Sequence, residues 1–117
     1  MELASEKTLY EEVIVRSQDW ASPDQLMFVV GATHPEKMRL IRALAPEHFF
    51  LVPGVGAQGG DLDLVMEQGM NRQCGLLINA ARSIIYASSE KDFAEQAAKE
   101  AEKLQRQMES HLADLNA

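Results

Sequence analysis

Three short runs of consecutive apolar residues, each followed by a segment with helical spacing, constrain the fold of this chain of 117 residues more than any other feature. The runs fall at about residues 26–31, 49–53 and 75–79. Strands separated by helices run parallel, because each helix carries the chain back to the start of the next strand. Continuous apolar character is typical of strands that are buried on both faces. We therefore predict an α/β fold with alternating helices and one parallel sheet, in one domain of residues 1–117.

The segments around these runs have the spacing and the terminal residues of helices. We expect a first helix from Glu6 to Trp20, a second that begins near Thr33 and a third that follows Asp61, with Thr33 and Asp61 as N-caps. A long final helix is expected at about residues 89–115, with one apolar stripe. The sheet would leave two apolar edges unpaired, which predicts more sheet from upstream residues or from another copy of the chain.

The charge balance narrows the classes of partner. Eleven Lys and Arg against eighteen Asp and Glu give a formal net charge of −7 at pH 7, which disfavours nucleic acid. The chain has no apolar run of membrane-spanning length and an acidic amino end unlike a secretory signal, so we expect a cytoplasmic location and no membrane partner. A single cysteine, Cys74, fits a reducing compartment, and the three separated histidines show no metal-ligand spacing, so no metal is predicted.

The segment after the second run has the composition of a phosphate-binding loop. Residues 54–60 contain four glycines, Gly59 among them, and lie between a strand and a helix. Glycines let successive N–H groups approach an anion closely, and the helix that follows adds its unpaired first-turn donors. Gln58 is the polar side chain of this loop. The third run ends in small residues and Arg82, whose guanidinium can bind phosphate oxygens with two hydrogen bonds.

Two consecutive strand ends of this kind match the phosphate site of a TIM barrel, which lies after strands seven and eight. Because only the terminal helix follows the third run, the chain is predicted to supply the last three βα units of a (βα)₈ barrel.

Three motifs in the same order resemble orotidine 5'-phosphate decarboxylase, in the spelling of its longer bacterial branch. They are VGAT at residues 30–33 with Pro35 and Glu36 opening the next helix, LVPGVGAQGGD at residues 51–61, and GLLINAARSIIYA at residues 75–87. The resemblance covers nearly all of this chain but only about the C-terminal two fifths of the enzyme.

The resemblance implies a function for particular residues. Gln58 would contact the 5'-phosphate, Arg82 with its own amide and that of Ala81 would hold the phosphoryl group, and Pro53 and Val55 would lie against the pyrimidine. Members of the family convert orotidine 5'-monophosphate (OMP) to UMP in pyrimidine biosynthesis, without metal or organic cofactor, as homodimers. The implied ligands are OMP, UMP or inorganic phosphate.

One motif of the family is missing from this chain. The chemistry depends on an Asp-x-Lys-x-x-Asp array, which does not occur here, so we expect the chain alone to be inactive and to supply only the phosphate-binding part. Two alternatives stay open. One is a non-catalytic phosphate-binding or self-associating half-barrel, and the other is a related barrel enzyme that acts on a sugar phosphate.

Overall fold

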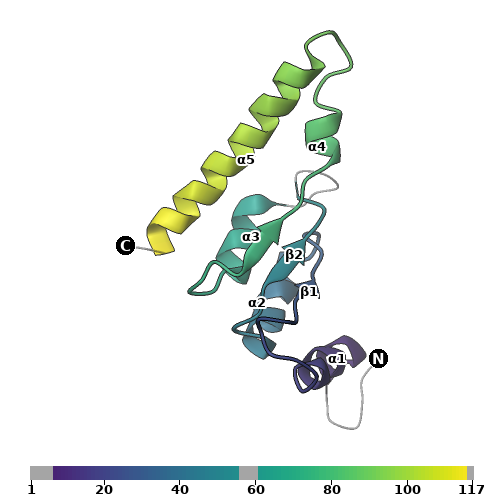
Figure 1. Ribbon diagram of the computed structural model, residues 1–117, viewed down its shortest axis with the longest axis vertical. Coiled ribbons are helices and arrows are strands. Elements are labelled where there is room, and N and C mark those ends of the chain that lie inside the picture. The colour runs from purple at the N-terminus through teal and green to yellow at the C-terminus, as the bar shows by residue number, and fades with distance from the viewer. Residues whose placement is uncertain (1–6, 56–60, 116–117) are drawn as a thin grey trace.

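The structure, a computed structural model, describes residues 7–55 and 61–115. Helices and strands alternate along these residues, as predicted (Figure 1). Their bounds are α1 Leu9–Ser17, β1 Phe28–Val29, α2 Pro35–Leu44, β2 Phe50–Val52, α3 Leu62–Gly69, β3 Leu76–Ile78, α4 Arg82–Ile85 and α5 Phe93–Leu115.

The three strands form one parallel sheet in the order β1-β2-β3. Phe28 of β1 pairs with Phe50 of β2, which pairs in turn with Leu76 of β3. This confirms the predicted fold class. Each strand is shorter than its apolar run, although the Val30 and Ala32 amides, beyond the end of β1, still donate to Leu51 O and Pro53 O.

The hydrophobic core lies between one face of the sheet and the helices. Phe50 and Val52 are completely buried there, against Met38 of α2 and the α3 residues Val65 and Met66. Side chains alternate between the two faces of a strand, so these residues define the covered face. Complete burial of these side chains is the main force that holds the helices on the sheet.

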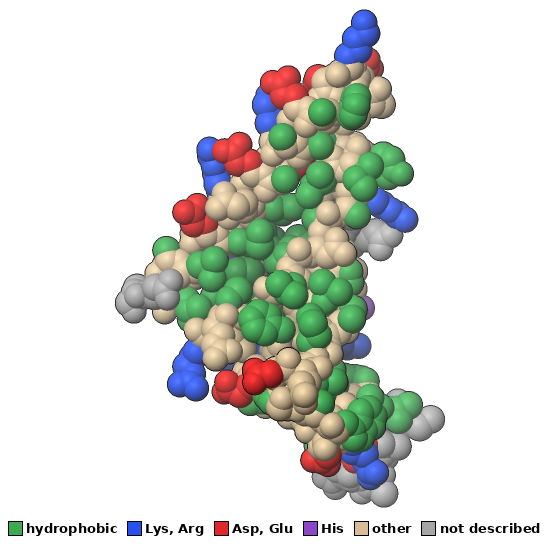
Figure 2. Space-filling view, in the orientation of Figure 1, with side chains coloured by type: hydrophobic (Ala, Val, Ile, Leu, Met, Phe, Trp, Pro, Cys, Tyr) green, Lys and Arg blue, Asp and Glu red, His purple; other side chains and the backbone are tan. Residues whose placement is uncertain are grey.

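The opposite face of the sheet carries no helix among the described residues. Val29 is 70% exposed, and Leu77, in register with it through Leu51, is 49% exposed. Figure 2 shows hydrophobic side chains gathered over the sheet on this side. The prediction that the strands are buried on both faces is therefore wrong for this chain, because only one face has a covering layer.

A buried arginine fastens the helices to the amino ends of the strands. Arg42 of α2 is 8% exposed, and its guanidinium donates to four backbone carbonyls. Nε reaches Gly69 O at 2.7 Å, Nη1 reaches His48 O at 2.6 Å and Ala45 O at 3.1 Å, and Nη2 reaches Gly75 O at 3.0 Å. The Arg42 Cζ atom also lies 3.8 Å from the centroid of the Phe50 ring.

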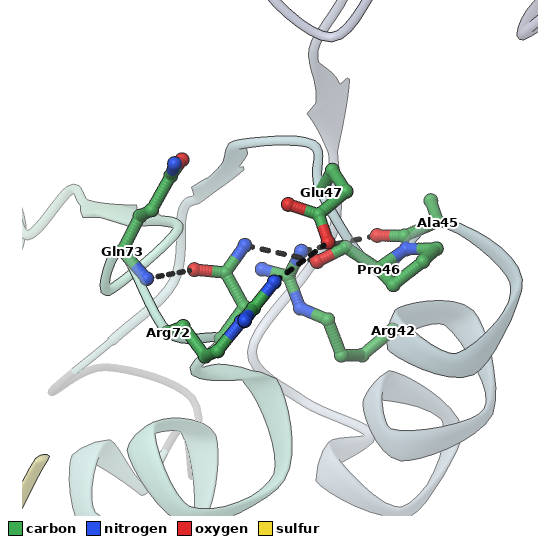
Figure 3. Close-up of polar contacts among 7 residues, drawn as sticks. Arg42, Ala45, Pro46, Glu47, Arg72 and Gln73 are labelled. Carbon is green, nitrogen blue, oxygen red and sulfur yellow. Dashed lines mark hydrogen bonds and ion pairs between the residues drawn. The ribbon is translucent and has the colours of Figure 1, made fainter.

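The loops around Arg42 are joined by contacts of their own (Figure 3). The Asn71 side-chain amide donates to Pro46 O at 3.1 Å, and Arg72 Nη2 lies 3.8 Å from Glu47 Oε1. Both contacts link the turn after α2 to the loop that precedes β3. The amino ends of β2 and β3 are thus held by side chains as well as by the sheet.

The starts of three helices, α1, α2 and α5, differ from the predictions, and α1 runs from Leu9 to Ser17 instead of from Glu6 to Trp20. The N-cap of α2 is His34, without a side-chain capping bond, and not Thr33; Pro35 takes the first helical position, where its missing N–H costs nothing. Helix α5 begins at Phe93 rather than near residue 89. Ser88 Oγ accepts from the Glu90 amide and donates to Asp92 Oδ1 at 2.6 Å, which forms a turn before the helix.

Helix α5 contacts the hydrophobic core and α3 through its C-terminal half, and α4 lies beside its N-terminal half (Figure 1). Leu104 and Met108 pack against the core, and His111 Nε2 lies 2.9 Å from Asp63 Oδ1 in the first turn of α3. The N-terminal half extends with α4 beyond the sheet (Figure 1). The molecule is accordingly elongated, with extents of 56 × 35 × 24 Å.

Candidate functional site

The carboxyl ends of the three strands meet at one edge of the sheet. The Asn79 amide, just after β3, donates to Val52 O at 3.0 Å, and the Ala32 amide donates to Pro53 O at 3.1 Å. The segments that follow β2 and β3 therefore start from adjacent positions. This is the arrangement that the sequence predicted for the glycine-rich loop and the Arg82 segment.

The first two residues of the glycine-rich segment show how it leaves β2. Gly54 has a φ of +87°, in the region that side chains disfavour, so glycine allows the sharp change of direction here. Val55 then returns to the core and is 1% exposed. Gln58 and Gly59, the predicted phosphate contacts of this loop, lie outside the described residues, and their roles stay predictions.

Asp61 begins the helix that follows the loop. It is the N-cap of α3, and its Oδ1 accepts from the Leu64 amide at 3.3 Å, which confirms the predicted cap. A carboxylate beside a phosphate site would repel the ligand. Because the Asp61 carboxylate accepts from the helix amide, part of its charge is offset by the helix end.

Ala81 and Arg82 follow β3 and are both exposed. Ala81 is the N-cap of α4, and its carbonyl accepts from the Ile85 amide at 2.8 Å. Arg82 is the first residue of this helix, and its guanidinium makes no hydrogen bond or ion pair with any described residue. An exposed arginine that has no partner among residues 7–55 and 61–115, placed where two strand ends meet, is available for an anionic ligand.

The predicted pyrimidine contacts have different surroundings. Pro53 is half-buried at the end of β2, beside the described part of the loop. Val55, by contrast, packs within the hydrophobic core. Contact of either residue with a pyrimidine stays a prediction.

Sequence reasoning missed two features near Arg82. The first is helix α4, four residues long, which places Arg82 in a helical turn rather than at the end of a strand. The second is Ser83, whose buried hydroxyl has no hydrogen-bond partner among the described residues. Four residues give too little periodicity to predict a helix, so the sequence carried no signal for it.

The strongest electrostatic perturbations lie at the other end of the strands. Burial lowers the pKa of the Arg42 guanidinium to about 10. The four carbonyls to which it donates hold the side chain in place. Burial, and then the charge of Arg42, lower the pKa of His48. Both groups surround the amino ends of β2 and β3, so we assign them to stability rather than to ligand binding.

Further chemistry of the described part of the chain is limited. These residues contain no group of three histidine, cysteine, aspartate or glutamate side chains that could hold a metal ion. None of their helices combines the length and the apolar character that crossing a membrane requires. Arg82 brings a cationic side chain to this edge of the sheet, which is the chemistry that recognition of an anion requires.

Comparison with known proteins gives a consistent result. No family model matches the chain. Over 101 residues it is 57% identical to an orotidine 5'-phosphate decarboxylase of Porphyromonas gingivalis, covering 86% of this chain and 37% of the relative. It is 50% identical over 111 residues to that of Parabacteroides distasonis, covering 95% of this chain and 40% of the relative.

Over most of its length the chain is similar to a C-terminal part of orotidine 5'-phosphate decarboxylases.

The structural likeness agrees with this assignment. The fold matches a Leishmania donovani UMP synthase with a TM-score of 0.73 at 34% identity, covering 90% of this chain and 23% of that protein. It matches a Leishmania donovani OMP decarboxylase with a TM-score of 0.71 at 29% identity, covering 92% and 41%. The chain spans about two fifths of the length of the bacterial relatives, as a C-terminal part of an orotidine 5'-phosphate decarboxylase.

Proposed function

We propose that this chain is the phosphate-binding part of an enzyme that decarboxylates OMP to UMP. The observation that carries the proposal is the meeting of two strand ends, joined by the hydrogen bond from the Asn79 amide to Val52 O at 3.0 Å. The exposed Arg82 and Ala81 follow one of these ends, and the glycine-rich segment follows the other. The names of the relatives supply the identity of the ligand, a nucleotide monophosphate.

Each residue of the site has a defined task in this proposal. Arg82 donates two hydrogen bonds to phosphate oxygens, and the amides of Ala81 and Arg82 supply further donors. Gln58 and the glycine amides, Gly59 included, close over the phosphate from the neighbouring strand, while Pro53 and Val55 would lie towards the pyrimidine.

The chain would contribute to catalysis through binding energy. Decarboxylation leaves a carbanion, which fixed charges stabilise and which a proton then quenches. Phosphate binding, remote from the reacting carbon, would hold the substrate against those charges and favour loop closure. The charged Asp-x-Lys-x-x-Asp array is not in these 117 residues, so the chain alone should not turn over OMP.

The partners follow from the same proposal. The small ligand is OMP, UMP or inorganic phosphate, with no metal or organic cofactor and no nucleic acid. The protein partner is the missing N-terminal part of the barrel or further copies of the chain. A cytoplasmic setting agrees with the single cysteine, Cys74.

Calorimetry of the pure chain with UMP, inorganic phosphate and ribose 5-phosphate tests the proposal. We expect UMP to bind at least as tightly as ribose 5-phosphate and Arg82→Ala to weaken UMP binding about 10- to 100-fold, the usual loss for a charge-assisted hydrogen-bonding pair. Arg72→Ala is the matched control, because the Arg72 side chain is 91% exposed and pairs only with Glu47 among described residues.

Three results would contradict the proposal. Unchanged UMP affinity in Arg82→Ala would remove the anion site, and a clear preference for ribose 5-phosphate would favour the sugar-phosphate alternative. Loss of OMP absorbance above background with the isolated chain would show that the charged array is not required.

A further inference from the structure

The parallel ladder continues past the ends of β2 and β3. Val52 pairs with Ile78 in the last pair of the two strands, and the Asn79 amide still donates to Val52 O at 3.0 Å. One residue further along each strand, Pro53 and Asn79 are therefore in register. Asn79 stands beside the residue that the sequence predicted to lie against a pyrimidine.

The same register reaches the first strand. The Ala32 amide donates to Pro53 O at 3.1 Å, which repeats, two residues on, the bond that the Val30 amide makes to β2. The residue between these two donors is Gly31, which therefore lies on the other side of Pro53. Gly31, Pro53 and Asn79 form one row across the carboxyl end of the sheet, and we call it the terminal row.

The Asn79 side chain lies on the uncovered face of the sheet. Leu76 is 6% exposed and Ile78 packs against the hydrophobic core, whereas Leu77 is 49% exposed on the opposite face. Side chains alternate along a strand, so Asn79 shares the face of Leu77. Asn79 is exposed, and its side-chain amide has no hydrogen-bond partner among residues 7–55 and 61–115.

The three members of the terminal row offer different contacts to a ligand. Gly31 leaves space, since even a methyl group there would meet no described atom within 4 Å. Pro53 offers an apolar ring, and Asn79 offers a carboxamide with one acceptor and two donors. An apolar surface for the face of a ring, with an amide at its edge, is how proteins read unpaired bases.

A uracil ring carries the matching groups. Its edge presents carbonyl oxygens that accept and an N–H that donates, so one carboxamide can make a pair of hydrogen bonds to it. Asn79 is the member of the terminal row with a polar side chain. The row therefore distinguishes a base from a plain apolar group through this residue.

Asn79 is also close to the predicted phosphate contact along the chain. Arg82, the first residue of α4, follows three residues later (Figure 1). Three residues span at most about 10 Å, so the carboxamide and the guanidinium start from nearby points of the same segment. Inorganic phosphate would use Arg82 alone, whereas a nucleotide, with its base and its phosphate joined by one sugar, would use both.

We propose that Asn79 is a specificity-determining residue, whose side-chain amide hydrogen-bonds the carbonyl and N–H edge of the pyrimidine while Arg82 binds the phosphate. This inference rests on the proposed function and adds selection of the base to it. The Asn79 amide makes UMP bind more tightly than ribose 5-phosphate, which has the sugar and the phosphate but no base.

Calorimetry of Asn79→Ala and Arg82→Ala with UMP, ribose 5-phosphate and inorganic phosphate tests this. We expect Asn79→Ala to weaken UMP binding about three- to tenfold, the usual loss for an uncharged hydrogen bond, and to leave the affinities for the other two ligands within about twofold. Arg82→Ala should weaken binding of all three. Gln73→Ala is the matched control, because it removes an exposed carboxamide near the amino end of β3 and should change no affinity.

Nuclear magnetic resonance gives a second measurement on the same residue. The side-chain NH₂ resonances of Asn79 are identified by their loss in Asn79→Ala. We expect them to shift on titration with UMP and to stay in place with ribose 5-phosphate. Circular dichroism verifies that the three variants keep the fold of the wild type.

The outcomes separate this inference from the proposed function. Equal losses of affinity for UMP and ribose 5-phosphate in Asn79→Ala would place the amide against the sugar and overturn the inference. Unchanged UMP affinity in Asn79→Ala, with Arg82→Ala still impaired, would overturn the inference and leave the proposed function standing. No binding of UMP to the wild-type chain, or UMP affinity unchanged in Arg82→Ala, would contradict both.

Discussion

Arg42 and Arg82 show how differently the same residue type can act in one small fold. Arg42 is buried and donates to four carbonyls, whereas Arg82 is exposed and has no partner among the described residues. Arg82 could be singled out from the sequence, because it follows an apolar strand and small residues. Arg42 could not, because its position in a helix looks like that of any solvated arginine, and only the tertiary structure brings the carbonyls to it.

Arg42→Met should destabilise the chain by about 3–5 kcal/mol, because it leaves buried carbonyls without a donor. Urea unfolding measures the effect. Arg72→Met removes a guanidinium that is 91% exposed and should leave the midpoint almost unchanged. Equal midpoints for the two variants would mean that the Arg42 hydrogen bonds contribute nothing.

His48 should make the chain sensitive to mild acid. Its ring is 3% exposed, neither nitrogen has a described partner, and its pKa is lowered by burial and by Arg42, against a smaller opposing effect of Glu47. A lowered pKa means that the unfolded state binds the proton more readily. Stability is therefore present above the unfolded pKa of about 6.5 and is lost as the pH falls below it.

Unfolding midpoints at pH 7.5, 6.5 and 5.5 test this sensitivity. We expect the wild type to lose more stability over this range than His48→Phe. The phenyl ring of this variant would keep the contact with Phe28, whose ring centroid lies 5.4 Å from that of His48 in the wild type. Identical pH profiles for the two proteins would assign the acid sensitivity to other groups.

At the scale of elements, the apolar runs and helix caps of the sequence predicted where the elements lie better than how long they are. Asp61 was correctly predicted to begin α3, because a capping residue before an apolar period is a local signal. Thr33 was not the cap of α2, since Pro35 sets the first helical position and moves the start to His34. Helix α4 could not be predicted, because it is only four residues long. The sheet has one covered face because the described residues supply no layer for the other.

Asp61→Ala should cost about 1 kcal/mol in unfolding free energy, because the Leu64 amide loses its acceptor. Asp61→Asn should retain most of the stability, since its side-chain carbonyl can still cap the helix. Loss of the same free energy in both variants would point to the charge of Asp61 instead of its hydrogen bond.

Leu104→Ala combined with Met108→Ala should release α5 from the core, since these residues are its apolar contacts with the core cluster. We expect faster proteolysis within residues 93–115, with the sheet still folded. Lys103→Ala, on the exposed side of the helix, is the control. Unchanged proteolysis in the double variant would mean that the contact between His111 Nε2 and Asp63 Oδ1 is sufficient to hold the helix.

At the scale of the whole molecule, the chain is more extended than its length requires. Its radius of gyration is 16.2 Å, whereas about 13 Å is typical of a compact domain of this length. The sequence predicted a partial barrel from the order of its motifs, and the exposed apolar face agrees with that prediction. The meeting of Gln58 and Arg82 at one anion stays a prediction, because Gln58 is outside the described residues.

The apolar face of the sheet that carries Val29 and Leu77 should be detectable in solution without any partner. We expect the native chain to enhance the fluorescence of the dye ANS, and Val29→Lys with Leu77→Lys to reduce the signal at unchanged unfolding free energy, because both side chains are already exposed. Leu40→Lys, which places the same charge at an exposed apolar side chain of α2, serves as the control. Absence of enhancement in the native chain would indicate that the face is covered.

The two unpaired strand edges have a consequence for protein engineering. A parallel edge accepts any strand with the right direction, spacing and apolar rows, whatever gene encodes it. Grafting this chain onto the front portions of unrelated barrels would therefore be a practical way to test whether the proposed phosphate-binding part can be moved between enzymes.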